Sequence, residues 1–172
     1  MKIKATILSA FFLCACAPAM NSSEADTIRM VLESTVGDVS LPRVLIAAKT
    51  SMGIYEDYSD SESTKRSKEY IKANLKLDGF DLTNALDDLF DKNRNPLRLT
   101  IESNPSKGYV IGSMKNPPPT GLHKLILSRP GIDNKSGLIL IYLESKELGV
   151  VEAYSKRDNK VKRIGFVRVW VS

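Results

Sequence analysis

The chain has 172 residues, of which 42% are hydrophobic and 26% are charged, and these values fit one globular domain and argue against two. The formal net charge of +5 is unevenly distributed. Residues 16–97 hold 10 basic and 14 acidic residues, a net −4, whereas residues 98–172 hold 13 basic and 6 acidic residues, a net +7. The C-terminal half is therefore the basic one.

The N-terminal end has the pattern of an export signal. Lys2 and Lys4 precede an apolar stretch at residues 5–13, which is too short to span a bilayer, since that needs about 20 apolar residues. Leu13-Cys14-Ala15-Cys16 follows, and it resembles the lipobox of bacterial lipoproteins. The resemblance implies cleavage before Cys16, a lipid on its thiol, acylation (palmitate) of the new amino terminus, and a membrane-anchored mature chain.

An ordinary secretory signal cut after Ala17-Pro18-Ala19 is the alternative, because small residues satisfy that cleavage site. The lipobox is favoured because it lies at the right distance from the apolar stretch, and because lipidation leaves no free thiol in an oxidising compartment. In lipoproteins of this kind, an Asp after the cysteine often retains the protein at the inner membrane. Ala17 stands there, so the resemblance implies the outer membrane, with the domain facing the periplasm.

These observations predict three segments. Residues 1–15 are the signal peptide, and residues 16–26 are a lipidated tether, because they are small and polar without periodicity. Residues 27–172 are a single domain.

The N-terminal third of this domain predicts one helix, one strand and one loop. Ile28, Val31 and Leu32 recur at helical spacing, which predicts a short helix. Residues 42–50 form a compact apolar run that we interpret as the first strand, with a helix as the alternative. Residues 55–67 are rich in Ser, Asp and Glu, which is typical of a solvated loop.

A second helix is predicted over residues 83–92, where one apolar face is formed by Leu82, Leu86, Leu89 and Phe90. Residues 70–77 fit a helix or a strand, and a helix is preferred. Residues 97–101 alternate like a half-buried strand, and residues 109–111 predict another. Three prolines at residues 117–119 predict a polyproline II loop.

The C-terminal third predicts an antiparallel meander of four strands with turns between them, at residues 125–127, 137–143, 149–155 and 161–170. Residues 137–143 are apolar on both faces, as in a central strand that is covered on each side. The predicted fold class is α+β, with an antiparallel sheet and the N-terminal helices packed on one face.

Several C-terminal motifs look like an uncharacterised family of exported bacterial proteins. They are a turn at Leu127-Ser128-Arg129-Pro130-Gly131-Ile132-Asp133, a strand at Ile141-Tyr142-Leu143, Tyr154 with Lys156 and Asn159-Lys160, and a terminal Trp170-Val171-Ser172. Ile132 stands where that family usually has Phe, and Arg163 near an expected Trp. The resemblance covers roughly the last 50 residues, and it implies export and the order of the strands but no site.

The residues needed for most enzyme chemistry are missing. His123 is the only histidine, and processing leaves no free cysteine, so neither a zinc site of His and Cys nor a cysteine nucleophile can be assembled. Phosphate-binding and dinucleotide motifs do not occur. We therefore predict no catalytic residue, metal or cofactor, and we expect His123 to lie at a surface or strand edge.

Two charged clusters remain. Asp87, Asp88 and Asp91 could form a carboxylate pair or a calcium site, but a solvated helix face explains them better, because the loop ligands of a calcium site are absent. A predicted hairpin carries a possible anion-binding site of five cations, Lys156, Arg157, Lys160, Lys162 and Arg163. The favoured alternative is that these cations protect an exposed strand edge from pairing.

The sequence thus leaves two functions open. The first is a non-enzymatic, membrane-anchored domain that binds an envelope protein, a glycan or an anionic lipid, with nucleic acid a poor candidate in this compartment. The second is an envelope hydrolase that uses carboxylates alone, as glycosidases do. The first is favoured because nothing in the sequence marks a pair of carboxylates as special.

Overall fold

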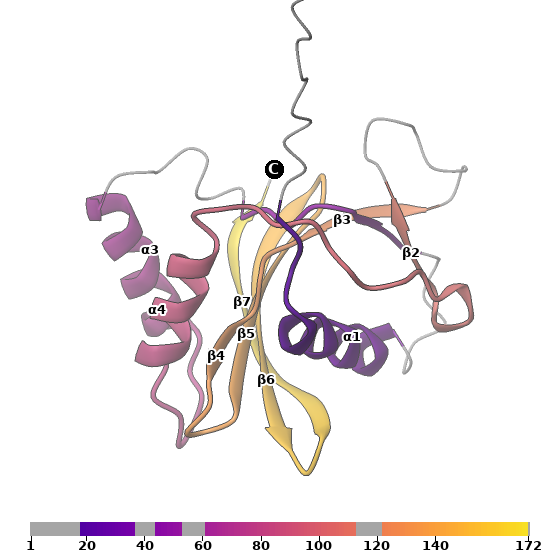
Figure 1. Cartoon of the computed structure of the whole chain (residues 1–172). Helices are drawn as coiled ribbons and strands as arrows, with labels where there is room; N and C mark the ends of the chain where they lie inside the picture. Colours follow the sequence, from indigo (N-terminus) through magenta and orange to yellow (C-terminus); the bar gives the residue numbers. More distant parts are fainter. Residues whose placement is uncertain (1–17, 37–43, 53–60, 113–121, 172) are drawn as a thin grey trace, which may run out of the picture.

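The structure is a computed structural model that describes residues 18–36, 44–52, 61–112 and 122–171 (Figure 1). Its elements are α1 (Ser22–Val36), β1 (Val44–Ala47), α3 (Ser61–Asn74), α4 (Thr83–Lys92), the 3-10 helix η1 (Pro105–Lys107), β2 (Tyr109–Gly112), β3 (His123–Leu127), β4 (Gly131–Asp133), β5 (Leu138–Glu144), β6 (Leu148–Arg157) and β7 (Lys160–Val171).

The strands form one mixed sheet in the order β2-β1-β3-β5-β6-β7, and β4 also pairs with β5. β1 is parallel to β2 and β3, whereas all the other pairs are antiparallel. The α+β class and the C-terminal meander are therefore confirmed, but the expectation of an antiparallel sheet is wrong for the part that contains β1, because the chain crosses over before each parallel partner. The first strand is also confirmed as a strand, since β1 lies within residues 42–50.

The helices cover both faces of the C-terminal strands, so the expected packing on one face is wrong (Figure 1). Ile139 and Ile141 of β5 belong to the core that contains α1, whereas Leu138, Leu140 and Tyr142 belong to the core that contains α4. Successive side chains of a strand point to opposite faces, and an all-apolar strand needs cover on both. The apolar pattern of this strand had indicated that double cover.

The helix α3 replaces the last part of a predicted loop. Its bounds include residues 61–67, which were expected to be solvated loop, while residues 55–60 lie outside the described residues. Its one buried side chain is Ile71, and Leu75 packs just beyond its end. A helix held by so few apolar contacts has a composition that looks like a loop, because nearly all of its surface faces water.

The folded domain begins earlier than the expected boundary at residue 27. Met20, Glu24 and Ala25 are buried, and α1 already starts at Ser22. The backbone of Met20 donates to the carbonyl of Arg98 at 3.1 Å. The small polar residues of this segment give no helical pattern in the sequence, but the apolar side chains of Met20 and Ala25 pack it onto the core.

The predicted strand at residues 97–101 is only partly formed. Arg98 makes isolated bridges to Ala19 and Lys49, and no regular ladder extends from it. The side chains nevertheless alternate as expected, with Leu97, Leu99 and Ile101 buried. The polyproline segment at residues 117–119 lies outside the described residues.

Candidate functional site

The predicted basic hairpin is formed by β6 and β7 and the turn between them. Asp158 and Asn159 occupy this turn with φ angles of 50° and 58°. Two consecutive positive φ values define the tight type I′ turn, which matches the twist of paired strands, and Asp and Asn tolerate this conformation better than most residues. The turn gathers all five predicted cations at one end of the hairpin.

The hairpin divides these cations between its two faces. Arg163 pairs with Tyr154, and Lys156 pairs with Val161. Tyr154 and Val161 both pack into the core beneath α1, so Arg163 and Lys156 share that face. The remaining cations, Arg157, Lys160 and Lys162, alternate onto the opposite face.

Only one of the five cations is neutralised internally. The guanidinium of Arg163 donates to the Oε1 of Glu152 at 3.0 Å and lies 5.1 Å from the ring centre of Phe166. Within the described residues, the exposed Lys156, Arg157, Lys160 and Lys162 form no ion pair. Arg157 even stands opposite Lys160, and a pair of like charges is unfavourable for the hairpin.

The hairpin tip lies at the far end of the sheet from the start of the described chain. The backbone N–H of Arg98 donates to the carbonyl of Pro18, and the backbone N–H of the nearby Ser51 donates to the carbonyl of Leu127. Leu127 in turn pairs with Leu143 near the end of β5, so Pro18 lies close to that end of the strand. Figure 1 shows the first described residues and the C-terminus at one end of the sheet and the tip at the other. Ten residues of β6 separate these ends by roughly 30 Å.

An open groove of about 380 Å³ runs between α1, the turn after β4 and the hairpin tip. Ser23, Thr27 and Asn134 line it together with Lys156 and Asp158. One lysine and one aspartate line this groove, so its lining carries no clear net charge. The uncompensated cations therefore lie on the tip and on the opposite face.

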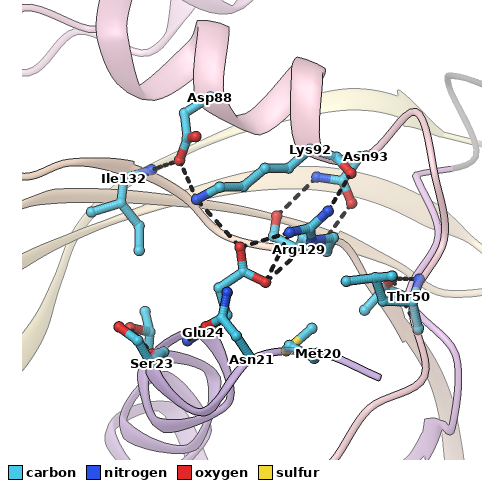
Figure 2. A network of polar contacts seen from close by, with 12 residues as sticks. Met20, Asn21, Ser23, Glu24, Thr50, Asp88, Lys92, Asn93, Arg129 and Ile132 are labelled. Carbon is cyan, nitrogen blue, oxygen red and sulfur yellow. Dashed lines mark hydrogen bonds and ion pairs between the residues drawn. The ribbon is translucent and has the colours of Figure 1, made fainter. Parts of the chain in front are cut away.

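A second charged cluster joins α1 to α4, and it surrounds a buried carboxylate with partly buried side chains (Figure 2). The carboxylate of Glu24, whose side chain is 4% exposed, accepts hydrogen bonds from Arg129 at 2.8, 3.1 and 3.2 Å. Lys92 lies 3.4 Å from the same carboxylate and 2.6 Å from Asp88. We call Glu24, Arg129, Lys92 and Asp88 the ionic junction.

The ionic junction occupies an interruption at the edge of the sheet. β3 and β4 both pair with β5, and residues 128–130 separate them. The Oγ of Ser128 accepts the backbone N–H of Tyr142 at 2.9 Å and so replaces a missing ladder carbonyl. This break lets Glu24 from one face reach Lys92 from the other.

Neighbouring groups fix the orientation of Arg129. Its backbone N–H donates to the Oδ1 of Asn93 at 2.7 Å, and its guanidinium donates to the carbonyl of Lys92 at 2.9 Å. Gly131 follows at a point where a Cβ atom would lie 2.2 Å from the carbonyl oxygen of Ala85. α4 therefore packs directly against the backbone of Gly131, and we interpret the ionic junction as a structural element of the fold.

A third cluster surrounds the buried carboxylate of Glu152. It accepts a hydrogen bond from the hydroxyl of Tyr154 in addition to the bond from Arg163. The Oγ1 of Thr35 lies 2.8 Å from the same hydroxyl and ties the end of α1 to β6. Burial, and then the negative charge of Glu152, raise the pKa of Tyr154 above its ordinary value of 10.0.

Each of the three aspartates of α4 pairs with a different cation. Asp87 pairs with Lys68 at 2.7 Å, Asp91 pairs with Arg94 at 3.1 Å, and Asp88 belongs to the ionic junction. Across the described ranges, no three His, Cys, Asp or Glu side chains come together as metal ligands would. The two most buried glutamates, Glu24 and Glu152, are each neutralised by an arginine. This arrangement favours structural roles over acid–base catalysis.

The remaining predicted residues are placed as follows. His123 is exposed at the start of β3, as expected. Cys16 lies outside the described residues, as does the signal segment. None of the helices that the structure describes is both long and apolar enough to cross a membrane.

Sequence reasoning missed the ionic junction. The resemblance motif did contain Ser128, Arg129 and Gly131, and all three prove to shape the break between β3 and β4. Two other motif residues also meet, since the indole Nε1 of Trp170 donates to the hydroxyl of Tyr142 at 2.8 Å. These motif residues are therefore explained by the fold.

Comparison with known proteins adds no family. No family model matches the chain, and neither a curated protein nor a solved structure matches it significantly.

Proposed function

We propose that this chain is an envelope lipoprotein, anchored through Cys16 to the outer membrane, whose domain binds a partner in the periplasm instead of catalysing a reaction. The lipobox pattern supports the anchor, and processing would remove residues 1–15. Cys16 would then be the first residue of the mature chain and would carry the lipid.

One observation carries the binding proposal, namely the contrast between paired and unpaired charges. The buried carboxylates of Glu24 and Glu152 are each neutralised by an arginine, whereas four cations at the hairpin tip have no ionic partner among the described residues. Exposed, uncompensated cations attract an anionic partner and raise the rate at which it associates with the domain. A hydrolase that uses carboxylates alone gains no support, because Glu24 and Glu152 are each held by an arginine.

The position of the tip narrows the choice of partner. Cys16 lies two residues before Pro18, so a lipid there would hold that end of the domain close to the membrane. The cations lie roughly 30 Å away at the other end of β6. This exceeds the Debye length of about 8 Å at physiological ionic strength, so the lipid head groups of the anchoring membrane are a poor partner. The partner is an anionic molecule on the far side of the domain.

The anchor is tested by Cys16→Ala in cells fed labelled palmitate. We expect the variant to lose the label and to accumulate as unprocessed precursor in the inner membrane, because the acceptor thiol is gone. Cys14→Ala serves as the matched control and should keep the label. A Cys16→Ala protein that is cut after Ala19 and released at the wild-type level would refute the anchor.

A further inference from the structure

The strand β7 forms an open edge of the sheet. It is 12 residues long, it ends the strand order, and β6 is its one strand partner among the described residues. The outer edge of such a strand presents backbone N–H and C=O groups that can pair with a further strand.

The exposed large apolar side chains of the described residues gather on this edge. They are Phe166 (48% exposed), Val171 (66% exposed) and Tyr70 (47% exposed). The first two belong to β7, and the hydroxyl of Tyr70 donates to the backbone carbonyl of Arg168 at 3.1 Å. Aromatic residues and arginine are enriched at protein interfaces, so the edge has the composition of a docking surface.

The two aromatic rings stand on opposite sides of β7. Phe166 pairs with Glu152, whose carboxylate bonds with Tyr154 in the core beneath α1. Tyr70 belongs to α3, which packs on the other face through Ile71. Alternate side chains of a strand added here would therefore meet one aromatic ring on each face.

The charge of β7 selects the partner. The strand carries four cations, Lys160, Lys162, Arg163 and Arg168, and no acidic residue. Antiparallel pairing of two β7 strands about their middle would set Arg163 opposite Arg168, which is unfavourable. The positive charge of β7 therefore disfavours binding of a second copy of this chain and favours binding of an acidic strand.

We infer that the outer edge of β7 is a docking site for an extended, acidic segment of a partner protein, which adds to the sheet as a further strand. The inference rests on the proposed binding function and names its partner class. Backbone hydrogen bonds supply affinity in this mode of recognition, and the alternating side chains supply specificity. Glutamates or aspartates of the segment pair with Lys160, Lys162 and Arg168.

The test uses a labelled ten-residue peptide of Glu and Val that presents glutamates on both of its faces, because Lys160 and Lys162 lie on one face of β7 and Arg168 on the other. The protein is the mature chain in zwitterionic detergent micelles. Fluorescence anisotropy measures its affinity, and hydrogen exchange measures protection of residues 160–171. A second peptide has methylated nitrogens at alternate positions, which keeps its charge but removes the backbone donors of one edge. Since each backbone hydrogen bond contributes a few-fold in affinity, we expect the methylated peptide to bind at least about tenfold more weakly.

Protein variants complete the test. Replacing Lys160, Lys162 and Arg168 with Gln should weaken binding by about tenfold or more, because several charge pairs are lost. A control that replaces Lys49, Lys107 and Lys124 with Gln removes the same charge elsewhere and should bind like the wild type. Melting temperatures verify that both variants fold.

Three results would overturn the inference. Equal binding of the two peptides would show attraction by charge alone, and no binding of the acidic peptide would show that the edge does not accept such a strand. Stronger binding of the unlipidated chain, free of detergent, to phosphatidylglycerol vesicles than to the peptide would show a membrane as the partner. Failure of the lipid anchor would appear separately, as unchanged palmitate labelling of Cys16→Ala, and would leave the peptide result interpretable.

Discussion

The ionic junction and the tip of the β6–β7 hairpin both concentrate charge, but they arrange it in opposite ways. In the junction, Glu24 is buried between Arg129 and Lys92, so each charge compensates another. At the tip, Arg157 stands opposite Lys160 and water screens both. The contrast teaches that charge used to build this fold is paired inside it, whereas unpaired charge is available to a partner.

The largest expected effect comes from breaking the junction with Arg129→Met. This change leaves the buried carboxylate of Glu24 with only Lys92 at 3.4 Å, and loss of one partner of a buried ion pair costs about 3–5 kcal/mol. Urea denaturation measures the free energy of unfolding. The matched control is Arg94→Met, whose exposed pair with Asp91 should contribute less than about 1 kcal/mol.

A double variant sharpens this prediction. Adding Glu24→Gln to Arg129→Met removes the uncompensated charge, so part of the lost stability should return. Equal losses for Arg129→Met and Arg94→Met would mean that the junction does not hold the two faces together.

An intermediate effect is expected for Tyr154→Phe, which removes a hydroxyl from the cluster around Glu152. The carboxylate and Thr35 lose a buried partner, so the variant should be destabilised by about 1–3 kcal/mol at neutral pH. The exposed hydroxyl of Tyr70 provides the control, and Tyr70→Phe should change stability by about 0.5 kcal/mol or less.

The same variant tests a pH dependence. Burial raises the pKa of Tyr154 above 10.0, so the unfolded chain ionises this group before the folded chain does. The stability that follows from this shift is fully present below pH 10 and is lost as the pH rises through the higher folded pKa. Between pH 10 and 12, the wild type should therefore lose stability more steeply than Tyr154→Phe. Parallel curves would contradict the assignment.

The smallest effect on stability, with a large effect on binding, is expected at the tip. Replacing Arg157, Lys160 and Lys162 with Gln should change the free energy of unfolding by no more than about 0.5 kcal/mol, because all three side chains are exposed. Arg163 is left in place because its pair with Glu152 is part of the fold.

Binding to an anionic probe should instead be lost in this variant. Both proteins are used without the lipid, because acyl chains would insert into vesicles whatever the charge of the tip. Phosphatidylglycerol vesicles are the anionic probe, and co-sedimentation at rising salt measures the association. The wild type should associate at 0.01 M salt and dissociate as the Debye length falls from about 30 Å to about 8 Å at 0.15 M. If neither protein associates and the variant aggregates more, the cations serve only to protect the edge.

The sequence by itself predicted the elements whose pattern is local. The predicted helix at residues 83–92 has the same bounds as α4, and the four strands of the meander pair in chain order. These predictions succeed because apolar periodicity and turn residues depend on neighbours a few positions away. The helix preferred for residues 70–77 overlaps the end of α3, but its largely polar first part at residues 61–67 was missed, since the stripe of buried side chains is too narrow to mark a helix.

Only the tertiary structure decided which charges meet. Glu24 and Arg129 are 105 positions apart, and their contact depends on the break between β3 and β4, where α1 on one face of the sheet lies opposite α4 on the other. The tertiary structure also gave Arg163, alone among the five cations of the hairpin, a carboxylate partner, and it set the hairpin tip at the far end of the sheet from the first described residues. A sequence pattern records the residue types, but the pairing of distant charges follows from the path of the chain, because Coulomb attraction acts on distance in space.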